Sequence, residues 1–235
     1  GKMRKLASKL RDQVVDAEEN MVEVRRDDRT IRDFEIPAQP WNDNVVQINS
    51  VKIVKNHEAE RVDCKVFLRK GQRLLISGPN GIGKSTLLRS LAEGKDEGAV
   101  IAKDVSVGYY RQDFSGLDFN KSTYDSLAEM MHVPDLQTIR AVGAHFLLNG
   151  DAMATKVGSL SEGQKGLLCF ARFVLQKPGL LILDEPTNHI NFRHIPVIAK
   201  ALENYQGAMI MVSHVPDFVG QINFGQELDL GKFLN

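Results

Sequence analysis

Apolar positions recur in two different patterns along the chain. In residues 1–35 they follow alternating steps of four and three, broken only by Asp28, at Met3, Ala7, Leu10, Val14, Ala17, Met21, Val24 and Ile31. This heptad spacing predicts a long coiled-coil-like helix whose other positions are mostly charged. Two interpretations stay open: an amphipathic helix lying on the following domain, or one arm of a helical hairpin.

The second pattern begins at Asn44, where short β-rich runs such as "VVQI" and "VKIV" give way to strands that alternate with helices, and "QELDLGKFL" closes with a strand. "LLILDEP" and "AMIMVSH" are fully apolar strands of the kind found inside a parallel sheet. A mainly helical stretch at about residues 116–176 interrupts the alternation. We therefore expect an α/β fold with a helical subdomain over residues 41–235. The two prolines of "EIPAQPW" separate it from a helical linker segment over residues 1–40.

Composition narrows the class of protein only slightly. The 235 residues carry 30 Lys and Arg against 30 Asp and Glu, so overall charge gives no reason to expect nucleic-acid binding. Cys64 and Cys169 lie in apolar contexts, which favours buried thiols of a reducing compartment over a disulfide. No apolar run reaches transmembrane length and no signal peptide opens the sequence, so we expect a cytoplasmic protein.

The peptide "GPNGIGKST" predicts a phosphate-binding loop. It matches the pattern G-x-x-x-x-G-K-[ST], with a strand before it and a helix after it. Its glycines let backbone N–H groups turn toward phosphate oxygens at the positive end of the helix. Lys84 reaches the β- and γ-phosphates and the Ser85 hydroxyl can ligate Mg²⁺. The candidate nucleotide-binding residues are Gly78, Pro79, Asn80, Gly81, Ile82, Gly83, Lys84, Ser85 and Thr86.

Polar residues also follow three other strands. Asp184 and Glu185 end "LLILDEP", where Asp184 would hold the Mg²⁺ shell and Glu185 would polarise an attacking water as general base. Gln112 follows "VSVGYYR" and His214 follows "MIMVS". Ligands bind at the carboxyl ends of parallel strands, so we expect these side chains to meet at one phosphate.

A second helix start, "SLSEGQKG", lies more than seventy residues beyond the phosphate loop. Ser161 can cap this helix, and Gln164 can reach back to the cap. On its own the peptide is an ordinary helix N-terminus, and its distance from the first loop leaves its purpose unexplained.

The order of these motifs resembles the ATP-binding cassette superfamily over essentially all of residues 44–235. The resemblance implies a P-loop ATPase cassette with a mixed sheet core that binds ATP and Mg²⁺. It implies Glu185, His214, Gln112 and Lys84 as catalytic residues, and Ser85, Gln112 and Asp184 as metal ligands. In that family two cassettes dock head to tail, and each signature peptide closes over the ATP of the other. Ser161, Gly163 and Gln164 would then serve a nucleotide held by a second cassette.

"EPTNHI" (residues 185–190) and the charged heptad segment look like the ABC-F proteins, which have two cassettes, a helical-hairpin linker and no membrane domain. On that resemblance the chain is the C-terminal half of a ribosome-associated ATPase, with rRNA and tRNA as partners. Its second cassette would be the N-terminal half of the parent chain, or another copy of this fragment. The alternative is the energy subunit of a membrane transporter. Three departures stand out: Glu162 replaces a signature glycine, Asn191 replaces an aspartate, and no adenine-stacking aromatic residue is found, which leaves Lys55 or His57 to take its place.

Overall fold

The computed structural model describes residues 8–18 and 29–235. The chain divides into two units, residues 1–31 and 32–235, and each is described by itself. No helix in the described ranges is long and apolar enough to cross a membrane.

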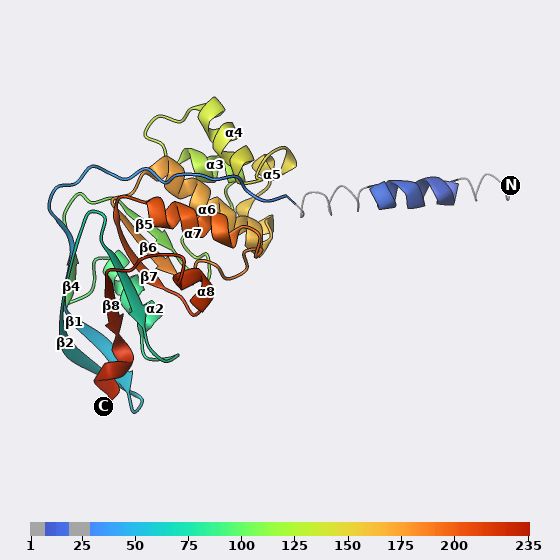
Figure 1. Ribbon diagram of the computed structural model, residues 1–235. Helices are drawn as coiled ribbons and strands as arrows, with labels where there is room; N and C mark the ends of the chain where they lie inside the picture. Colours follow the sequence, from blue (N-terminus) through green and yellow to red (C-terminus); the bar gives the residue numbers. More distant parts are fainter. Residues whose placement is uncertain (1–7, 19–28) are drawn as a thin grey trace. The chain divides into compact units, whose positions relative to one another are not determined.

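In the first unit a helix covers residues 8–18, with Leu10 and Val14 each 55% exposed (Figure 1). The prediction of one long helix that runs into the domain is wrong, because residues 29–43 contain no helix. Four members of the predicted heptad series lie outside the described residues, namely Met3, Ala7, Met21 and Val24. Asp28, which breaks the series, lies outside them as well.

The irregular segment after residue 31 packs against the domain instead of continuing a helix. Phe34 makes an edge contact with Phe146, at 4.8 Å between ring centroids. The Gln39 backbone N–H donates to the carbonyl of Pro178 at 3.2 Å, and its side-chain oxygen accepts from the N–H of Ser106 at 2.7 Å. The backbone and side chains here thus find partners in the domain that a helical conformation would not offer.

A five-stranded parallel sheet forms the centre of the second unit (Figure 1). Every residue of its two most central apolar strands, β6 and β7, is buried, as their uninterrupted apolar sequences predict. In spatial order the strands are β5 (Val107–Tyr110), β6 (Leu180–Asp184), β7 (Ala208–Val212), β3 (Arg73–Ser77) and β8 (Gln226–Asp229). The carboxyl ends of these strands therefore share one edge.

A second, antiparallel sheet has the order β2-β1-β4, with β1 (Asn44–Lys55), β2 (Glu58–Arg69) and β4 (Ala99–Ile101). The helix that follows the phosphate loop, α2 (Lys84–Ala92), contacts both sheets, through β1 and β4 on one side and β6 on the other. Its apolar residues Leu87, Leu88 and Leu91 are buried in the core that joins the sheets. This packing fixes the start of α2 close to the ends of the parallel strands.

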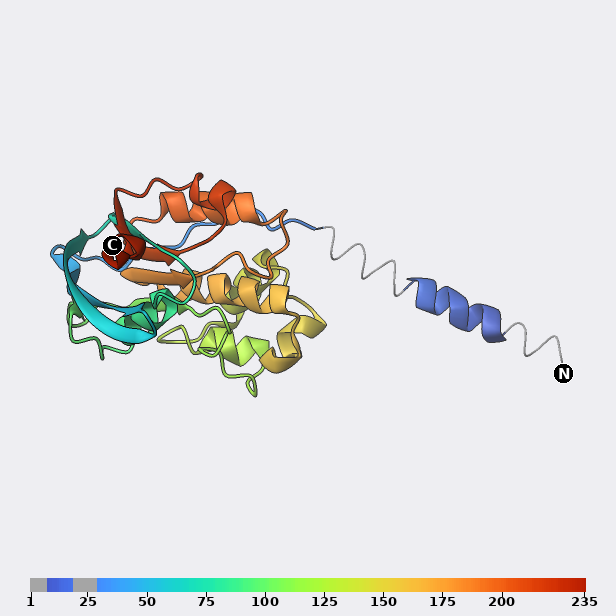
Figure 2. The same cartoon turned by 90° about the horizontal axis from the view of Figure 1, so that it is seen from below.

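The remaining helices cover the five-stranded sheet and extend beyond it. The longest, α6, and the later α7 lie on opposite faces of the sheet (Figure 2). Helices α3 to α6, which lie between β5 and β6 in the chain, pack against one another as a helical subdomain. The bounds are α3 (Thr123–Ala128), α4 (Leu136–His145), α5 (Asp151–Ala154), α6 (Glu162–Gln176), α7 (Ile195–Asn204) and α8 (Pro216–Val219), with 3₁₀ turns at Val157–Ser159 and Leu230–Leu234. The α/β fold that the sequence predicts, with parallel and antiparallel strands, is confirmed.

Candidate nucleotide-binding site

The loop between β3 and α2 turns through left-handed glycines. Gly78 has φ = 143° and Gly83 has φ = 115°, a region that other residues rarely adopt. A Cβ atom at Gly83 would lie 3.3 Å from the carbonyl oxygen of Lys52, so the loop also approaches β1 too closely for a larger residue. The geometry brings the backbone of the loop to the N-terminus of α2, where an anion is stabilised.

Lys84, the first residue of α2, folds back over this loop. Its ammonium group donates to the carbonyl oxygens of Gly78 at 2.6 Å and Pro79 at 3.0 Å. Lys84 is only 6% exposed, and burial lowers the pKa of its ammonium group while the carboxylates of Glu185 and Asp184 oppose that shift. The charge is thus held at the mouth of the loop, within reach of a phosphate.

One cavity of about 550 Å³ brings most of the predicted residues together. This is the size of an ordinary small-molecule site. Its walls include ten predicted residues, namely Asn80, Gly81, Gly83, Lys84, Ser85, Thr86, Gln112, Asp184, Glu185 and His214. Pro79 and Ile82 line an adjoining cavity beside Lys55, whereas His57 lines neither of the two.

Asp184 ends β6 next to Ser85 and is 3% exposed. Burial raises the pKa of its carboxyl group, and the Ser85 hydroxyl and the Lys84 ammonium oppose that shift. Its Oδ1 atom is buried and has no hydrogen-bond partner among the described residues. A buried carboxylate oxygen without a partner is costly, so Ser85 and Asp184 fit a divalent cation shared with a phosphate group.

Glu185, the next residue, lies in a left-handed backbone conformation with φ = 50°. Its N–H donates to the carbonyl of Val212 at 2.8 Å, which holds it against β7. Its Oε2 atom accepts from the backbone N–H of His214 at 3.2 Å, and the ring Nε2 of His214 lies 3.3 Å from Oε1. Burial raises the pKa of the Glu185 carboxyl group, and the contacts with His214 oppose the shift. The carboxylate of Glu185 and the imidazole of His214 thus lie next to each other at one end of the cavity.

The signature peptide is separate from this cavity. None of Ser161, Gly163 and Gln164 lines it in the described part of the chain. The predicted capping box at the start of α6 is present: the N–H of Gln164 donates to Ser161 Oγ at 3.1 Å, and the N–H of Ser161 donates to the Gln164 side chain at 2.9 Å. The Ser161 hydroxyl therefore keeps its own proton free to donate. Glu162 is 53% exposed in its side chain and forms an ion pair with Lys165 at 2.9 Å.

Four residues that are not among the predicted site residues also line the main cavity: Val54, Asn188, Val212 and Val215. Val54 lies at the cavity because its N–H donates to the carbonyl of Ile82 at 2.9 Å, a hydrogen bond that joins β1 to the phosphate loop. No sequence signal marks this contact. Asn188 lies in the "EPTNHI" peptide that carries the resemblance, four residues after Asp184, so its position near the site has a sequence signal.

A glycine loop between a parallel strand and a helix, opposite two carboxylates at the end of another strand, defines the class of P-loop nucleotide-binding proteins. A family profile described as ABC transporter matches residues 62–188, and the chain belongs to this family of ATP-binding cassettes.

Among similar curated proteins, YdiF of Bacillus subtilis is 37% identical over 194 residues, which cover 80% of this chain and 30% of that protein. ABC transporter F family member 5 of Arabidopsis thaliana is 34% identical over 184 residues, 74% of this chain and 27% of that protein. The chain thus spans less than a third of these relatives. A bacterial Atm1-family ABC exporter with ATP bound shares the fold, with a TM-score of 0.68 at 20% identity over 94% of this chain and 43% of the exporter chain.

Proposed function

We propose that this chain binds and hydrolyses ATP with Mg²⁺, as one half of a head-to-tail pair of cassettes. The observation that carries the proposal is the convergence of the phosphate loop, two buried carboxylates and His214 on one cavity. The residues come from the ends of three parallel strands and the start of α2, far apart in the sequence. Such a set serves phosphoryl transfer to water, which depends on positioning and charge stabilisation.

In this proposal Lys84 leaves the carbonyls of Gly78 and Pro79 and donates to the β- and γ-phosphates. Ser85, Asp184 and Gln112 would hold Mg²⁺, which neutralises charge on the phosphate oxygens when bound. Glu185 accepts a proton from the attacking water. The His214 backbone N–H and imidazole orient the Glu185 carboxylate toward that water.

The second cassette is part of the proposal because the signature peptide has no place in its own cavity. Ser161 and Gly163 stand at the N-terminus of α6, a helix of 15 residues, where N–H groups and the dipole favour an anion. We propose that they meet the γ-phosphate of a nucleotide held by the other cassette. The partner is then either another segment of a longer chain or a second copy.

Action on the ribosome is a further part of the proposal. Its support is the similarity to proteins named as F family members, together with the "EPTNHI" peptide. The charged helix over residues 8–18 has exposed apolar positions, Leu10, Val14 and Val15, that a partner helix or RNA-bound protein could cover. Co-sedimentation of the Glu185→Gln protein with ribosomes tests this part.

The hydrolytic role is tested with Glu185→Gln in a preparation that contains both cassettes. The substitution keeps the shape and the bond from the His214 N–H but removes the base, so turnover should fall about a hundredfold or more. Binding of a fluorescent ATP analogue should persist. As a matched control, Glu60→Gln removes an exposed carboxylate on β2 and should leave turnover unchanged. Near-normal turnover of the Glu185 variant would show that another group is the base.

A further inference from the structure

We propose that Arg111 is a positioning residue that sets where Gln112 stands relative to the Mg²⁺ position. This inference rests on the proposed function. Two cavities of the domain meet at Tyr109 and Arg111, since both residues line both cavities. One cavity, of about 170 Å³, contains Ser85, Gln112 and Asp184, the three proposed metal ligands.

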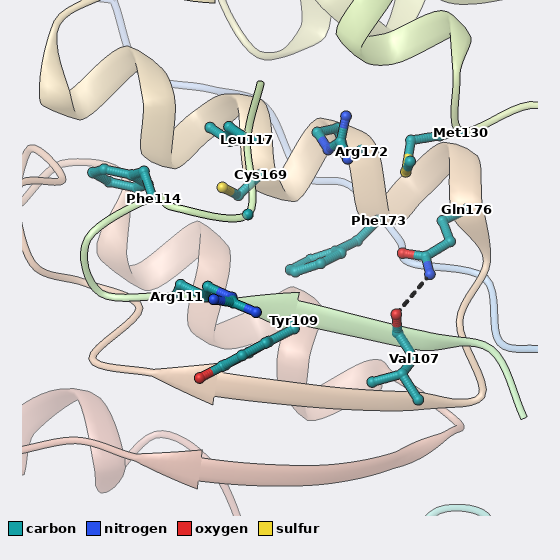
Figure 3. A pocket seen from close by; sticks show the side chains of 11 residues that line it. Val107, Tyr109, Arg111, Phe114, Leu117, Met130, Cys169, Arg172, Phe173 and Gln176 are labelled. Carbon is teal, nitrogen blue, oxygen red and sulfur yellow. Dashed lines mark hydrogen bonds between the residues drawn. The ribbon is translucent and has the colours of Figure 1, made fainter. Parts of the chain in front are cut away.

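The second cavity, of about 240 Å³, opens between β5 and the helical subdomain (Figure 3). Its far wall comes from α6, through Cys169, Arg172 and Phe173. Figure 3 shows the Arg111 side chain next to the Tyr109 ring at the edge of this space. Arg111 therefore stands where the parallel sheet, the helical subdomain and the proposed metal site adjoin.

The guanidinium group of Arg111 has three partners from three places in the chain. Its carbon lies 4.9 Å from the centroid of the Tyr109 ring. Its Nη2 atom lies 3.5 Å from Oε1 of Glu93, the residue that caps the C-terminus of α2. Its Nη1 atom donates to the hydroxyl of Ser115 at 3.3 Å. The group thus ties residue 115 to β5 and α2.

The residues between Arg111 and Ser115 form a tight turn. The N–H of Phe114 donates to the carbonyl of Arg111 at 3.1 Å, and the N–H of Ser115 donates to the Asp113 carboxylate at 3.0 Å. Phe114 is 2% exposed and has φ = 58°, so the turn is anchored in the core in a conformation that few side chains adopt.

Gln112 lies inside this turn and has no anchor of its own. Its side chain forms no hydrogen bond with any residue in the described ranges, and it is exposed while it lines the metal cavity. Its position is consequently determined by the residues that hold the turn on either side of it. Burial fixes Phe114 on one side, and on the other side the guanidinium group of Arg111 holds the turn where the chain leaves Tyr110 of β5.

The experiment measures how much Mg²⁺ is needed to tighten binding of a fluorescent ATP analogue, which requires neither hydrolysis nor a second cassette. Arg111→Met should raise the Mg²⁺ concentration at half-effect about fivefold, the size expected for loss of a stacked, partly exposed charge. Affinity in EDTA should stay within about twofold of wild type, because the phosphate loop is untouched. Arg111→Lys should resemble Arg111→Met, since an ammonium group cannot both stack and bridge.

Lys95→Met is the matched control. Lys95 pairs with the same Glu93 carboxylate at 3.3 Å but does not touch the turn, so its loss should leave the Mg²⁺ requirement unchanged. In a Gln112→Ala background Arg111→Met should have no further effect, because Arg111 acts through Gln112.

Four outcomes are decisive. An unchanged Mg²⁺ requirement in Arg111→Met, or an equal rise in the Gln112→Ala background, overturns the inference alone. A wild-type protein whose nucleotide binding gains nothing from Mg²⁺ overturns the proposed function and this inference with it. A rise that depends on Gln112 supports both.

Discussion

Glu185 occupies a position that is unfavourable for its residue type in two ways. Its φ of 50° is rare for a residue with a long side chain, and its carboxylate is 6% exposed. Strained backbone and buried charge often coincide at functional sites, where the surrounding structure holds them in place. Here the bond from Glu185 to the Val212 carbonyl and the contacts with His214 provide that hold.

Glu185→Gln should therefore stabilise the ligand-free protein at neutral pH. The pKa of the Glu185 carboxyl group is raised by burial, so its contribution to stability is present below the ordinary pKa of 4.5 and is lost as the pH rises through the folded value. At pH 7.5 the neutral amide avoids this loss and should raise Tm by about 2–4 °C, as about 1 kcal/mol does in a protein of this size. At pH 4 wild type is itself protonated, so the difference should vanish. Thermal melting at both pH values measures it, and a lower Tm at pH 7.5 would contradict the assignment of a destabilising charge.

At the scale of elements, one of the close contacts between β5 and α6 lies beside the signature peptide. A Cβ atom at Gly166 of α6 would lie 2.8 Å from the hydroxyl oxygen of Tyr110 on β5 and 3.0 Å from a methyl group of Ile190. The Tyr110 hydroxyl is buried and has no hydrogen-bond partner in the described part of the chain. The contact therefore combines tight packing with an unsatisfied polar group, next to the signature peptide at the start of α6.

Two substitutions separate these effects. Gly166→Ala alone should destabilise the domain by about 1–3 kcal/mol, because Tyr110 cannot move within the core. Tyr110→Phe should be neutral or stabilising, since it removes a buried hydroxyl without a partner. The double variant should recover part of the loss, because the phenyl ring lacks the atom nearest the new methyl group. Urea denaturation of the four proteins measures the coupling between the two sites. If the changes in the free energy of unfolding simply add, the new methyl group clashes with Ile190 and not with the Tyr110 hydroxyl.

The elements also show which features the sequence predicts well and why others differ. Buried parallel strands such as β6 and β7 are evident because four or five consecutive apolar residues suit no exposed element of the same length. "VVQI" and "VKIV" suggest two strands but form the single strand β1, because a register shift between Ile48 and Ser50 interrupts the alternation. "QELDLGKFL" is a strand only to Asp229, whose side chain then accepts from the N–H of Gly231 and turns the chain into a 3₁₀ helix.

The candidate site likewise contains some residues that the sequence predicts and others that it does not. Residues in contiguous motifs, such as Lys84 and Asp184, are predictable because each motif has one chemical purpose. Val54 and the partners of Arg111 are not, because they depend on hydrogen bonds and packing between elements distant in sequence. The irregular backbone from residue 29 onward was not predictable from the heptad series for a related reason. The periodicity of the series indicates an apolar face that must pack against another surface. It does not indicate whether the backbone stays helical up to the domain.

At the scale of the whole molecule, the proposed function gives this cassette half of each of two sites. The cavity around Lys84 and Glu185 is lined by no signature residue in the described chain. Under that proposal, pairing two cassettes head to tail would complete both sites at once, which is the symmetric solution for two copies. ATP hydrolysis should then require association, whereas nucleotide binding should not.

Specific ATPase activity of this chain should therefore rise with protein concentration. When dimers are scarce, activity per molecule is proportional to concentration, and it levels off once most copies are paired. Ser161→Ala removes the hydroxyl offered across the interface and should lower the plateau about tenfold while leaving ATP binding to the same molecule unchanged. Mixing the Ser161→Ala and Lys84→Ala variants should restore part of the activity, because one of the two composite sites is then intact. The measurements are turnover from nanomolar to high micromolar protein, with sedimentation to follow association. A high rate that is independent of concentration, from a protein that sediments as a monomer, would mean that the cavity around Lys84 hydrolyses ATP without a partner.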